Sequence, residues 1–254
     1  MSVREKVLGA ESRWLMGRVM AGDFLEGVGK YLHLVAPDRE KELTAAIQAR
    51  AGELAEADKD MVVDKPSEGA LGIGAAVLAS FETLLPLFDG DERRTILYLQ
   101  HVMGEVLKRP YELAFKTLSE RKNPLDKIDK ACRAEEPFYG ASWDIDFERP
   151  WPDLFEMNVR RCFWHDFFAR HDAMLVTTVM CSWDTNWMRA IDPAVSGLRA
   201  ERTSLLSLGD DQCRFAVLET DDPLAGYSDK IEQRFTGQQE SGCWRVGARC
   251  REHG

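Results

Sequence analysis

The amino-acid sequence predicts an α+β fold, in which a helical N-terminal half packs on a C-terminal strand–helix–hairpin unit with an antiparallel sheet. Two patterns lead to this prediction. Apolar residues recur at helical spacing through the first half of the chain. Beyond residue 155 they alternate with polar residues in short segments, which is typical of half-buried strands. With 254 residues, 44% of them hydrophobic and 30% charged, the chain has a globular composition and can bury a substantial core.

Several helices are expected in the first half. Apolar residues between positions 14 and 25 recur at helical spacing, and residues 39–58 form an amphipathic pattern with Glu and Lys on the wet face. Residues 71–88 are the most apolar stretch, and Ser67 can cap the helix that contains them. After a turn, residues 91–121 predict one or two further helices.

The apolar stretch at residues 71–88 has about the minimum length of a membrane span. It contains Glu82 and Pro86 and has polar flanks, so a buried helix is the better interpretation. The first fourteen residues contain no apolar core of a secretory signal. We therefore expect a cytoplasmic protein whose six cysteines are reduced thiols or ligands rather than disulfides.

The second half predicts a strand, a broken helix and a hairpin. Residues 155–162 alternate apolar and polar side chains, as a half-buried strand does. Residues 163–191 have a helical pattern, and the β-branched run at 176–179 is a place where that helix can break. Residues 198–209 and 213–220 predict two strands joined by a Gly-Asp-Asp turn.

These patterns divide the chain into three parts. Residues 1–135 form the helical region, residues 136–222 form an α+β core that contains the central cysteines, and residues 223–254 form a polar tail. The tail has little periodicity, so we expect it to be loosely ordered or ordered by a partner. Alternatively, the three parts form one integrated domain.

The charge of the chain bears on its partners. A net charge of −10 and a pI near 5.1 argue against nucleic acid and anionic membranes as partners. A small-molecule substrate is the expected partner, and a homo-oligomer stays open.

Three cysteines concentrate the reactive chemistry: Cys162, Cys181 and Cys213. Cys181 and Asp184 lie three residues apart, so on a helix they share a face. A thiol and a carboxylate in that arrangement can act as a nucleophile and its acid–base partner. The alternative is that Cys181 is a small buried apolar residue. Asp184 does not fit that alternative, since it lies between two tryptophans in a segment that favours burial.

A second motif begins at the first of these cysteines. Cys162, His165 and Asp166 stand at positions i, i+3 and i+4, directly after a predicted strand. In the first turn of a helix, backbone N–H groups would lower the pKa of the Cys162 thiol. The alternative for His165 is an ordinary histidine that makes one hydrogen bond. His171 points elsewhere on the helix and is expected at the surface.

Zinc binding competes with thiol catalysis as the use of these side chains. Cys162, His165, Cys181 and Cys213 would form a Cys₃His set. Their spacing is irregular and no Cys-x-x-Cys pair occurs in the chain, so we expect no cofactor and keep zinc as the alternative. The nucleophile elbow, the Walker loop and the His-Glu-x-x-His motif are also absent from the sequence.

The order of these motifs resembles that of a known family. The resemblance rests on Arg161-Cys162, on Cys181-Ser-Trp-Asp184, on the segment from Thr203 to Gly209, and on Cys213-Arg-Phe215. In this order the motifs resemble the L-2-amino-thiazoline-4-carboxylic acid hydrolase family, over residues 155–219. The Gly-x-x-x-Cys-x-Phe ending is also similar to the small-molecule-binding domain found beside 4-vinyl reductases, which has a similar strand–helix–hairpin arrangement.

The resemblance implies hydrolytic opening of a small heterocyclic C=N ring, with a carbamoyl amino acid as product. Cys181 would be the nucleophile, with Cys162 second, and Asp184 or His165 would protonate the departing atom. Arg161 or Arg199 would hold a substrate carboxylate. The remaining expected pocket residues are Trp183 and Cys213. The family commonly has Asp after the last cysteine where this chain has Arg214, which puts ring or carboxylate recognition in doubt.

Three alternative functions remain. The chain could be a related biosynthetic enzyme that acts on another heterocycle. It could be a non-catalytic sensor whose cysteines line a small-molecule pocket, or a zinc-binding protein. Labelling, turnover and metal analysis distinguish them.

Overall fold

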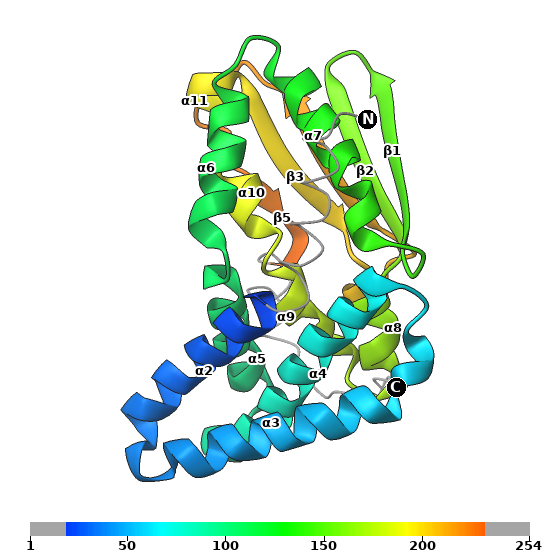
Figure 1. The fold of residues 1–254 in the computed structure, drawn as a ribbon. Coiled ribbons are helices and arrows are strands. Elements are labelled where there is room, and N and C mark those ends of the chain that lie inside the picture. The colour runs from blue at the N-terminus through cyan, green and yellow to red at the C-terminus, as the bar shows by residue number, and fades with distance from the viewer. Residues whose placement is uncertain (1–18, 232–254) are drawn as a thin grey trace, which may run out of the picture.

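A computed structural model describes residues 19–231 of the chain. It confirms the α+β fold. A five-stranded sheet is covered by helices on one face, and a group of helices lies at one end of it (Figure 1). The buried apolar side chains form one continuous cluster from Met20 to Ile231. The division of the chain near residue 135 stays a prediction.

The described part of the first half, residues 19–139, forms helices and the turns between them. The α-helices are α2 (Ala21–Val35), α3 (Glu40–Ala57), α4 (Lys65–Leu84), α5 (Glu92–Glu105), α6 (Lys108–Ser119) and α7 (Pro124–Tyr139). Helix α4 packs against α2, α3, α5 and α8, whereas α7 packs on three strands of the sheet. The helices that follow the first hairpin are α8 (Phe163–Arg170), α9 (Thr177–Cys181), α10 (Thr185–Arg189) and α11 (Pro193–Ser196).

Helix α4 is the buried helix that the apolar stretch predicts. Its N-cap is Asp64, not Ser67 as expected. The Asp64 carboxylate accepts a hydrogen bond from the Ser67 backbone at 2.8 Å, and the Ser67 hydroxyl accepts one from the Asp64 backbone at 2.9 Å. Ser67 therefore occupies the third position of a capping box, one turn inside the helix.

Within residues 19–231, one segment is long and apolar enough to cross a membrane. It is Lys65–Phe88, which contains α4, and 67% of its most apolar window is buried inside the protein. A core helix has the same length and composition, so the segment is weak evidence for a span.

The sheet has the strand order β1-β2-β4-β3-β5. Its strands are β1 (Asp144–Trp151), β2 (Leu154–Arg161), β3 (Leu198–Ser204), β4 (Cys213–Glu219) and β5 (Ser228–Asp229). The first four pair antiparallel, which confirms the antiparallel sheet predicted for β2, β3 and β4, and β5 pairs parallel to β3. The sequence did not predict β1, because this edge strand buries no side chain fully and so carries no clear apolar pattern.

The predicted break in the long helix is real, but it lies earlier than expected. Helix α8 ends at Arg170, and Asp172 takes a left-handed conformation with φ of 54°. The β-branched run at 176–179 lies within α9 and the turn before it. A turn residue with positive φ, rather than the branched side chains, therefore separates α8 from α9.

Two expectations about exposed residues are wrong. His171 is not a free surface residue, because its Nε2 lies 2.7 Å from the carboxylate of the buried Asp58. Residues 228–231 of the predicted tail are not loose, because β5 joins the sheet and Asp229 is only 3% exposed. Residues 232–254, including Cys243 and Cys250, and residues 1–18 lie outside the described part of the chain.

Candidate functional site

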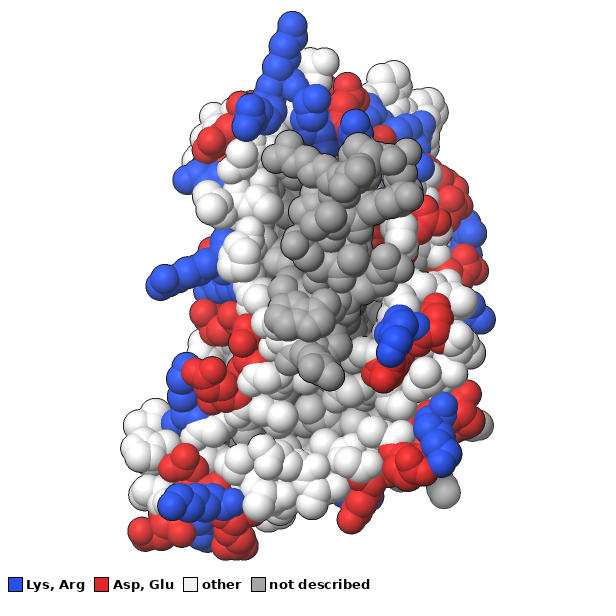
Figure 2. Space-filling view, viewed as in Figure 1, with Lys and Arg blue, Asp and Glu red and all other residues white. Residues whose placement is uncertain are grey.

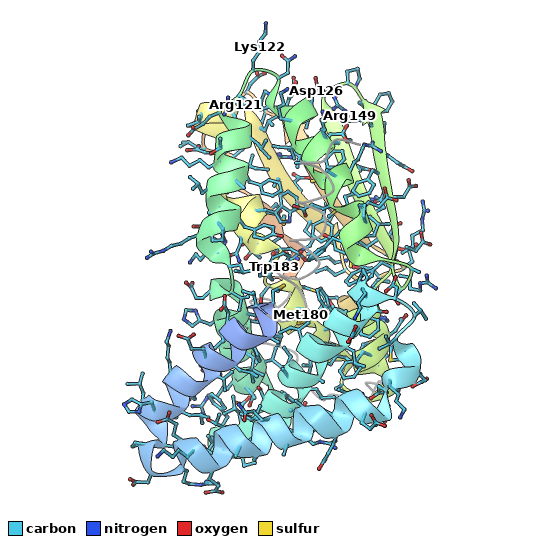
Figure 3. All side chains as sticks on the ribbon, viewed as in Figure 1. Arg121, Lys122, Asp126, Arg149, Met180 and Trp183 are labelled. Carbon is cyan, nitrogen blue, oxygen red and sulfur yellow. The ribbon has the colours of Figure 1, made fainter. Side chains whose placement is uncertain are left out.

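A cavity of about 40 Å³ lies between the sheet and the helices that cover it. Its wall combines aromatic rings with sulfur-containing side chains. The aromatic residues are Tyr139, Trp143, Trp164, Trp183 and Phe215, and the sulfur-containing ones are Cys162, Met180, Cys181, Cys213 and Met157. In Figure 3, Met180 and Trp183 lie between the group of helices α2–α5 and the sheet. The three cysteines singled out in the sequence therefore border one hollow.

Four of the lining residues come from one helical face. Thr177, Met180, Cys181 and Asp184 stand at positions i, i+3, i+4 and i+7 through α9 and the turn that follows it. The other two cysteines come from the sheet side, since Cys162 follows β2 and Cys213 begins β4. These two strands are neighbours, so the two thiols reach the cavity from the same edge.

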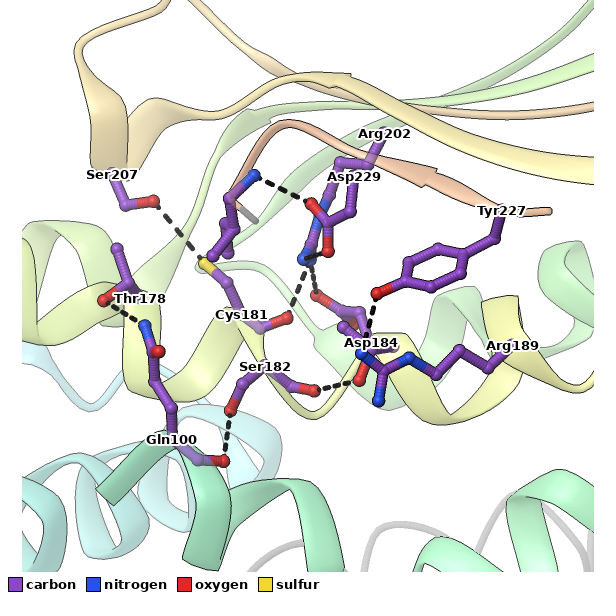
Figure 4. A network of polar contacts seen from close by, with 12 residues as sticks. Gln100, Thr178, Cys181, Ser182, Asp184, Arg189, Arg202, Ser207, Tyr227 and Asp229 are labelled. Carbon is purple, nitrogen blue, oxygen red and sulfur yellow. Dashed lines mark hydrogen bonds and ion pairs between the residues drawn. The ribbon is translucent and has the colours of Figure 1, made fainter. Parts of the chain in front are cut away.

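The carboxylate of Asp184 belongs to a buried ionic network (Figure 4). Arg202 donates from Nη1 to the Cys181 carbonyl at 2.7 Å and to Asp184 Oδ2 at 3.3 Å. The same guanidinium donates from Nε and Nη2 to the two oxygens of Asp229, at 3.0 and 2.6 Å. Arg202 and Asp229 have no side-chain exposure. The bidentate pair neutralises both of its members and leaves Asp184 with the longer contact.

Burial raises the pKa of Asp184 to about 6, while the positive charge of Arg202 lowers it and the negative charge of Asp229 raises it. The side chain keeps 26% of its surface exposed, so protons can reach the carboxyl group. Two carboxylates share one guanidinium here, which leaves one excess negative charge when both are ionised. A carboxyl group whose pKa is raised to about 6 can gain and lose a proton near neutral pH, as an acid–base group must.

A second carboxyl group lies near this one. Burial and the negative charge of Asp184 raise the pKa of Glu135, on α7, to about 7. Tyr139, one turn further along α7, lines the cavity. Glu135 was not among the predicted site residues, since nothing in the charged stretch around it indicates that α7 covers the cavity.

The three thiols are all protonated in the resting structure. Burial raises the pKa of Cys162 and Cys181 strongly and that of Cys213 to about 11. The expectation of a lowered pKa at Cys162 is wrong. Backbone N–H groups of Trp164 and His165 do act on that sulfur and lower its pKa, but the effect of burial is larger.

Hydrogen bonds from the indole rings hold the aromatic wall in place. Trp183 Nε1 donates to the Val106 carbonyl at 2.9 Å, and Trp164 Nε1 donates to the Ala70 carbonyl at 3.0 Å. Trp164 also packs edge-to-face against Trp143, with ring centroids 4.9 Å apart. Since both carbonyls belong to the helical half, that half positions the wall of the cavity.

Three of the predicted site residues do not line the cavity. His165 pairs with the neighbouring Asp166 at 3.5 Å on the outer side of α8. Arg161, at the exposed end of β2, donates to the Ala141 carbonyl at 2.7 Å. Arg199 pairs with Glu201 on the face of β3 opposite to the buried one.

The alternation of β3 explains the error with Arg199. Leu198, Ala200 and Arg202 are buried, so Arg202 is the arginine that faces inward. Likewise, Arg214 alternates with the inward Cys213 and Phe215, and it points away from the cavity toward Asn158. Arg202 was not among the predicted site residues, although the period of two from the apolar Leu198 places it on the buried face.

The donor set for zinc is not assembled in the described residues. No group of three or more His, Cys, Asp or Glu side chains between residues 19 and 231 is placed to hold a metal ion. His165, the nitrogen ligand of the predicted set, lies outside the cavity wall. The geometry therefore does not support the Cys₃His alternative.

Comparison with known proteins adds one finding. The model of a family described as L-2-amino-thiazoline-4-carboxylic acid hydrolase matches residues 87–217. Every residue that lines the cavity, from Tyr139 to Phe215, lies within that span. No curated protein matches the chain.

Proposed function

The chain belongs to the L-2-amino-thiazoline-4-carboxylic acid hydrolase family, whose model matches more than half of its residues, and from this premise we propose that it hydrolyses a small cyclic amidine of the thiazoline type. One observation carries the proposal. The matched span encloses a cavity in which thiols border a carboxyl group that titrates near neutral pH. A nucleophile and an acid–base group are what the ring-opening reaction requires.

Cys181 is the proposed nucleophile. Cys181 is half-buried as a residue, whereas Cys162 and Cys213 are buried. It lies on the same helical face as Asp184, one turn before it. Since the thiol is protonated at rest, a base has to remove its proton as it attacks, and ionised Asp184 takes that role.

The first half-reaction opens the ring. The Cys181 sulfur forms a bond to the amidine carbon, and its proton moves to Asp184. The bond between that carbon and the ring sulfur then breaks, and the departing sulfur takes the proton from Asp184 and becomes a thiol. The product of this step is an amidine group attached to Cys181 through sulfur.

The second half-reaction releases the product. Water adds to the amidine carbon and gives one proton to Asp184 and the other to the imine nitrogen, which becomes NH₂. The bond from carbon to the Cys181 sulfur breaks as that sulfur regains the proton from Asp184. The water oxygen becomes the carbonyl of a carbamoyl group. The net change is the addition of one water molecule, and neither an oxidant nor a metal is required.

A direct experiment tests this function. Purified full-length protein is incubated with 2-amino-2-thiazoline and with its 4-carboxylate, and the products are analysed by mass spectrometry. We expect the mass to increase by one water and a free thiol to form. Cys181→Ala should lower the rate by about 10³-fold or more, while Cys132→Ala, a buried thiol outside the cavity, should not change it. No ring opening with either compound would contradict the proposal.

The same preparation tests the proposed absence of a metal. Because the reaction needs no Lewis acid, metal analysis should find no zinc bound in proportion to the chain. About one zinc per chain would favour the zinc alternative instead. All four cysteines in the described part are free, which supports our proposal of a reducing, cytoplasmic location.

A further inference from the structure

The buried Arg202, on β3, contacts three parts of the proposed site. Its Nη1 donates to the carbonyl of Cys181 at 2.7 Å and to Asp184 Oδ2 at 3.3 Å (Figure 4). The guanidinium also lies over the ring of Phe215, 5.5 Å from the ring centroid, and that ring lines the cavity. One cation therefore contacts the residue of the proposed nucleophile, the proposed base and a wall of the cavity.

A short strand outside the family match holds this arginine. Strand β5 pairs with β3, and Asp229 stands opposite Arg202 in the register. The two oxygens of Asp229 accept from Nε and Nη2 at 3.0 and 2.6 Å, and one of them also accepts from the Ile231 backbone at 3.0 Å. The family model matches residues 87–217, so Asp229 lies beyond the matched span. The resemblance to the family therefore does not indicate this residue.

The two aspartates share the guanidinium unequally. Asp229 accepts two N–H groups in a bidentate pair, whereas Asp184 shares Nη1 with a backbone carbonyl and has the longest of the contacts. A carboxylate that alone faced a buried arginine would be strongly held in its ionised form and would be a weak base. Because Asp229 takes the bidentate position, Asp184 does not have the positive charge of Arg202 to itself.

Other titratable groups also face Asp184. Burial raises the pKa of each of them, and the negative charge of Asp184 adds to that rise. They lie on α6, on α7, at the end of α9 and at the start of β4, and they are Tyr111, Glu135, Tyr139, Cys181 and Cys213. Each of these groups is neutral or negative, so none of them counters the positive charge of Arg202 as directly as the ionised Asp229 does.

We propose that Asp229 is a positioning residue for the reaction: by holding Arg202 in a bidentate pair, it keeps Asp184 basic enough to take the proton of Cys181, while the same arginine holds the turn that carries both groups. This inference rests on the proposed function and deepens it. Asp229 is not among the residues that line the cavity, so it acts through Arg202 and not on the substrate.

The titration of Asp184 in full-length variants tests the inference. It is followed by NMR of ¹³C-labelled aspartate carboxyl groups and by the pH dependence of kcat/KM with 2-amino-2-thiazoline-4-carboxylate. Asp229→Asn keeps the shape of the side chain and removes its charge, so the pKa of Asp184 should fall by about one pH unit. The rate at pH 5 relative to pH 8 should then rise by about 5-fold. Asp229→Glu, which keeps the charge, should leave the pKa near 6.

A double variant decides the question if Asp229→Asn does not fold. Arg202→Met combined with Asp229→Asn removes the buried cation together with its partner, so neither position keeps an unpaired charge. Asp184 then loses the attraction of the arginine, and its pKa should rise above about 6, opposite to the single variant. The control is Lys230→Gln, which removes the ion pair of Lys230 with Asp210 beside β5 and should leave the titration of Asp184 unchanged.

The signs of these shifts decide the outcome. An unchanged or raised pKa of Asp184 in folded Asp229→Asn, a lowered pKa in the double variant, or an equal shift in Lys230→Gln would overturn the inference. The NMR titration does not depend on turnover. If the wild-type chain opens neither thiazoline but the pKa moves as expected, the proposed function fails and the control of Asp184 by Asp229 stands. Turnover with an unmoved pKa keeps the hydrolase and rejects the inference.

Discussion

Two aspartates that contact arginine lie in different parts of the molecule and differ in how completely they are paired. Asp58 follows α3, its side chain is 4% exposed, and Arg170 and His171 contact its two oxygens at 3.0 and 2.7 Å. Asp184 borders the cavity, is 26% exposed, and contacts at 3.3 Å an arginine that is already paired with Asp229.

The comparison shows how similar residue types acquire different roles. Arg170 and His171 each contact one oxygen of Asp58, so that carboxylate joins the end of α3 to the end of α8. Asp184 and Asp229 contact the same guanidinium. With a pKa of about 6, the Asp184 carboxyl group is mainly protonated at lower pH. We infer that Asp58 serves the fold and Asp184 serves the reaction. Figure 2 shows that acidic and basic side chains are interspersed along the edges of the face in view.

The largest expected effect separates the two aspartates by activity. Asp184→Asn keeps the size and hydrogen-bonding shape of the side chain but removes its acid–base function, so the turnover rate should fall by about 10²- to 10⁴-fold. Asp58→Asn should leave the rate of the folded protein within a few-fold of wild type. Both are measured as kcat on protein whose fold is verified by circular dichroism. Equal losses of kcat in the two variants would contradict the assignment of Asp184 to the reaction and of Asp58 to the fold.

The second-largest expected effect distinguishes Asp58 from Asp184 by the stability of the protein. Asp58→Ala leaves His171 and the half-exposed Arg170 without their buried partner. We expect the free energy of unfolding to fall by about 2 to 4 kcal/mol, toward the lower end for a broken buried pair because Arg170 is 44% exposed. Urea denaturation measures it. A loss below about 0.5 kcal/mol would show that this contact is not structural.

The third effect depends on pH. The folded-state pKa of Asp184 is raised from 3.8 to about 6, so its contribution to stability is fully present below pH 4 and is lost as the pH rises through 6. Asn resembles the protonated form at every pH. Asp184→Asn should therefore be more stable than wild type by about 1 to 3 kcal/mol near pH 8 and equal to it near pH 4. Urea midpoints at both pH values test the sign, and a less stable variant at the higher pH contradicts it.

The smallest expected effect is a difference in stability between variants of two neighbouring threonines, one with a hydrogen-bonded hydroxyl and one without. Thr178→Val removes a hydroxyl that bonds to Gln100 and Leu175, and it should cost about 1 kcal/mol of stability. Thr177→Val removes a hydroxyl without a partner, so the variant should be as stable as wild type or slightly more stable. Thermal unfolding of the two proteins side by side provides the measurement. The reverse order would show that the Thr177 hydroxyl is bonded in solution.

The sequence was sufficient to find the residues of the cavity that lie on one helix or have a distinctive spacing. Cys181 and Asp184 share a helical face, and that local relation holds in the structure. Cys162 and Cys213 were identified by residue type, and the pairing of β2 with β4 brings them together.

The other parts of the site could not be predicted, because they depend on contacts between segments that are distant in the sequence. The ionic network needs β5 beside β3, and a two-residue strand in a polar stretch has no detectable pattern. Glu135 reaches the site only because α7 packs over the sheet. The pKa values of the thiols likewise follow from burial, which the spacing of cysteines along the chain does not encode.

The titration of the Asp184 carboxyl group tests the central claim most directly. The full-length chain is labelled with ¹³C at its aspartate carboxyl carbons, and NMR spectra are recorded against pH for wild type and Asp184→Asn. We predict one resonance that titrates near pH 6 in wild type and is missing from the variant. If the resonance lost in the variant titrates below pH 4, Asp184 is an ordinary ion-paired carboxylate and the proposed acid–base role is wrong.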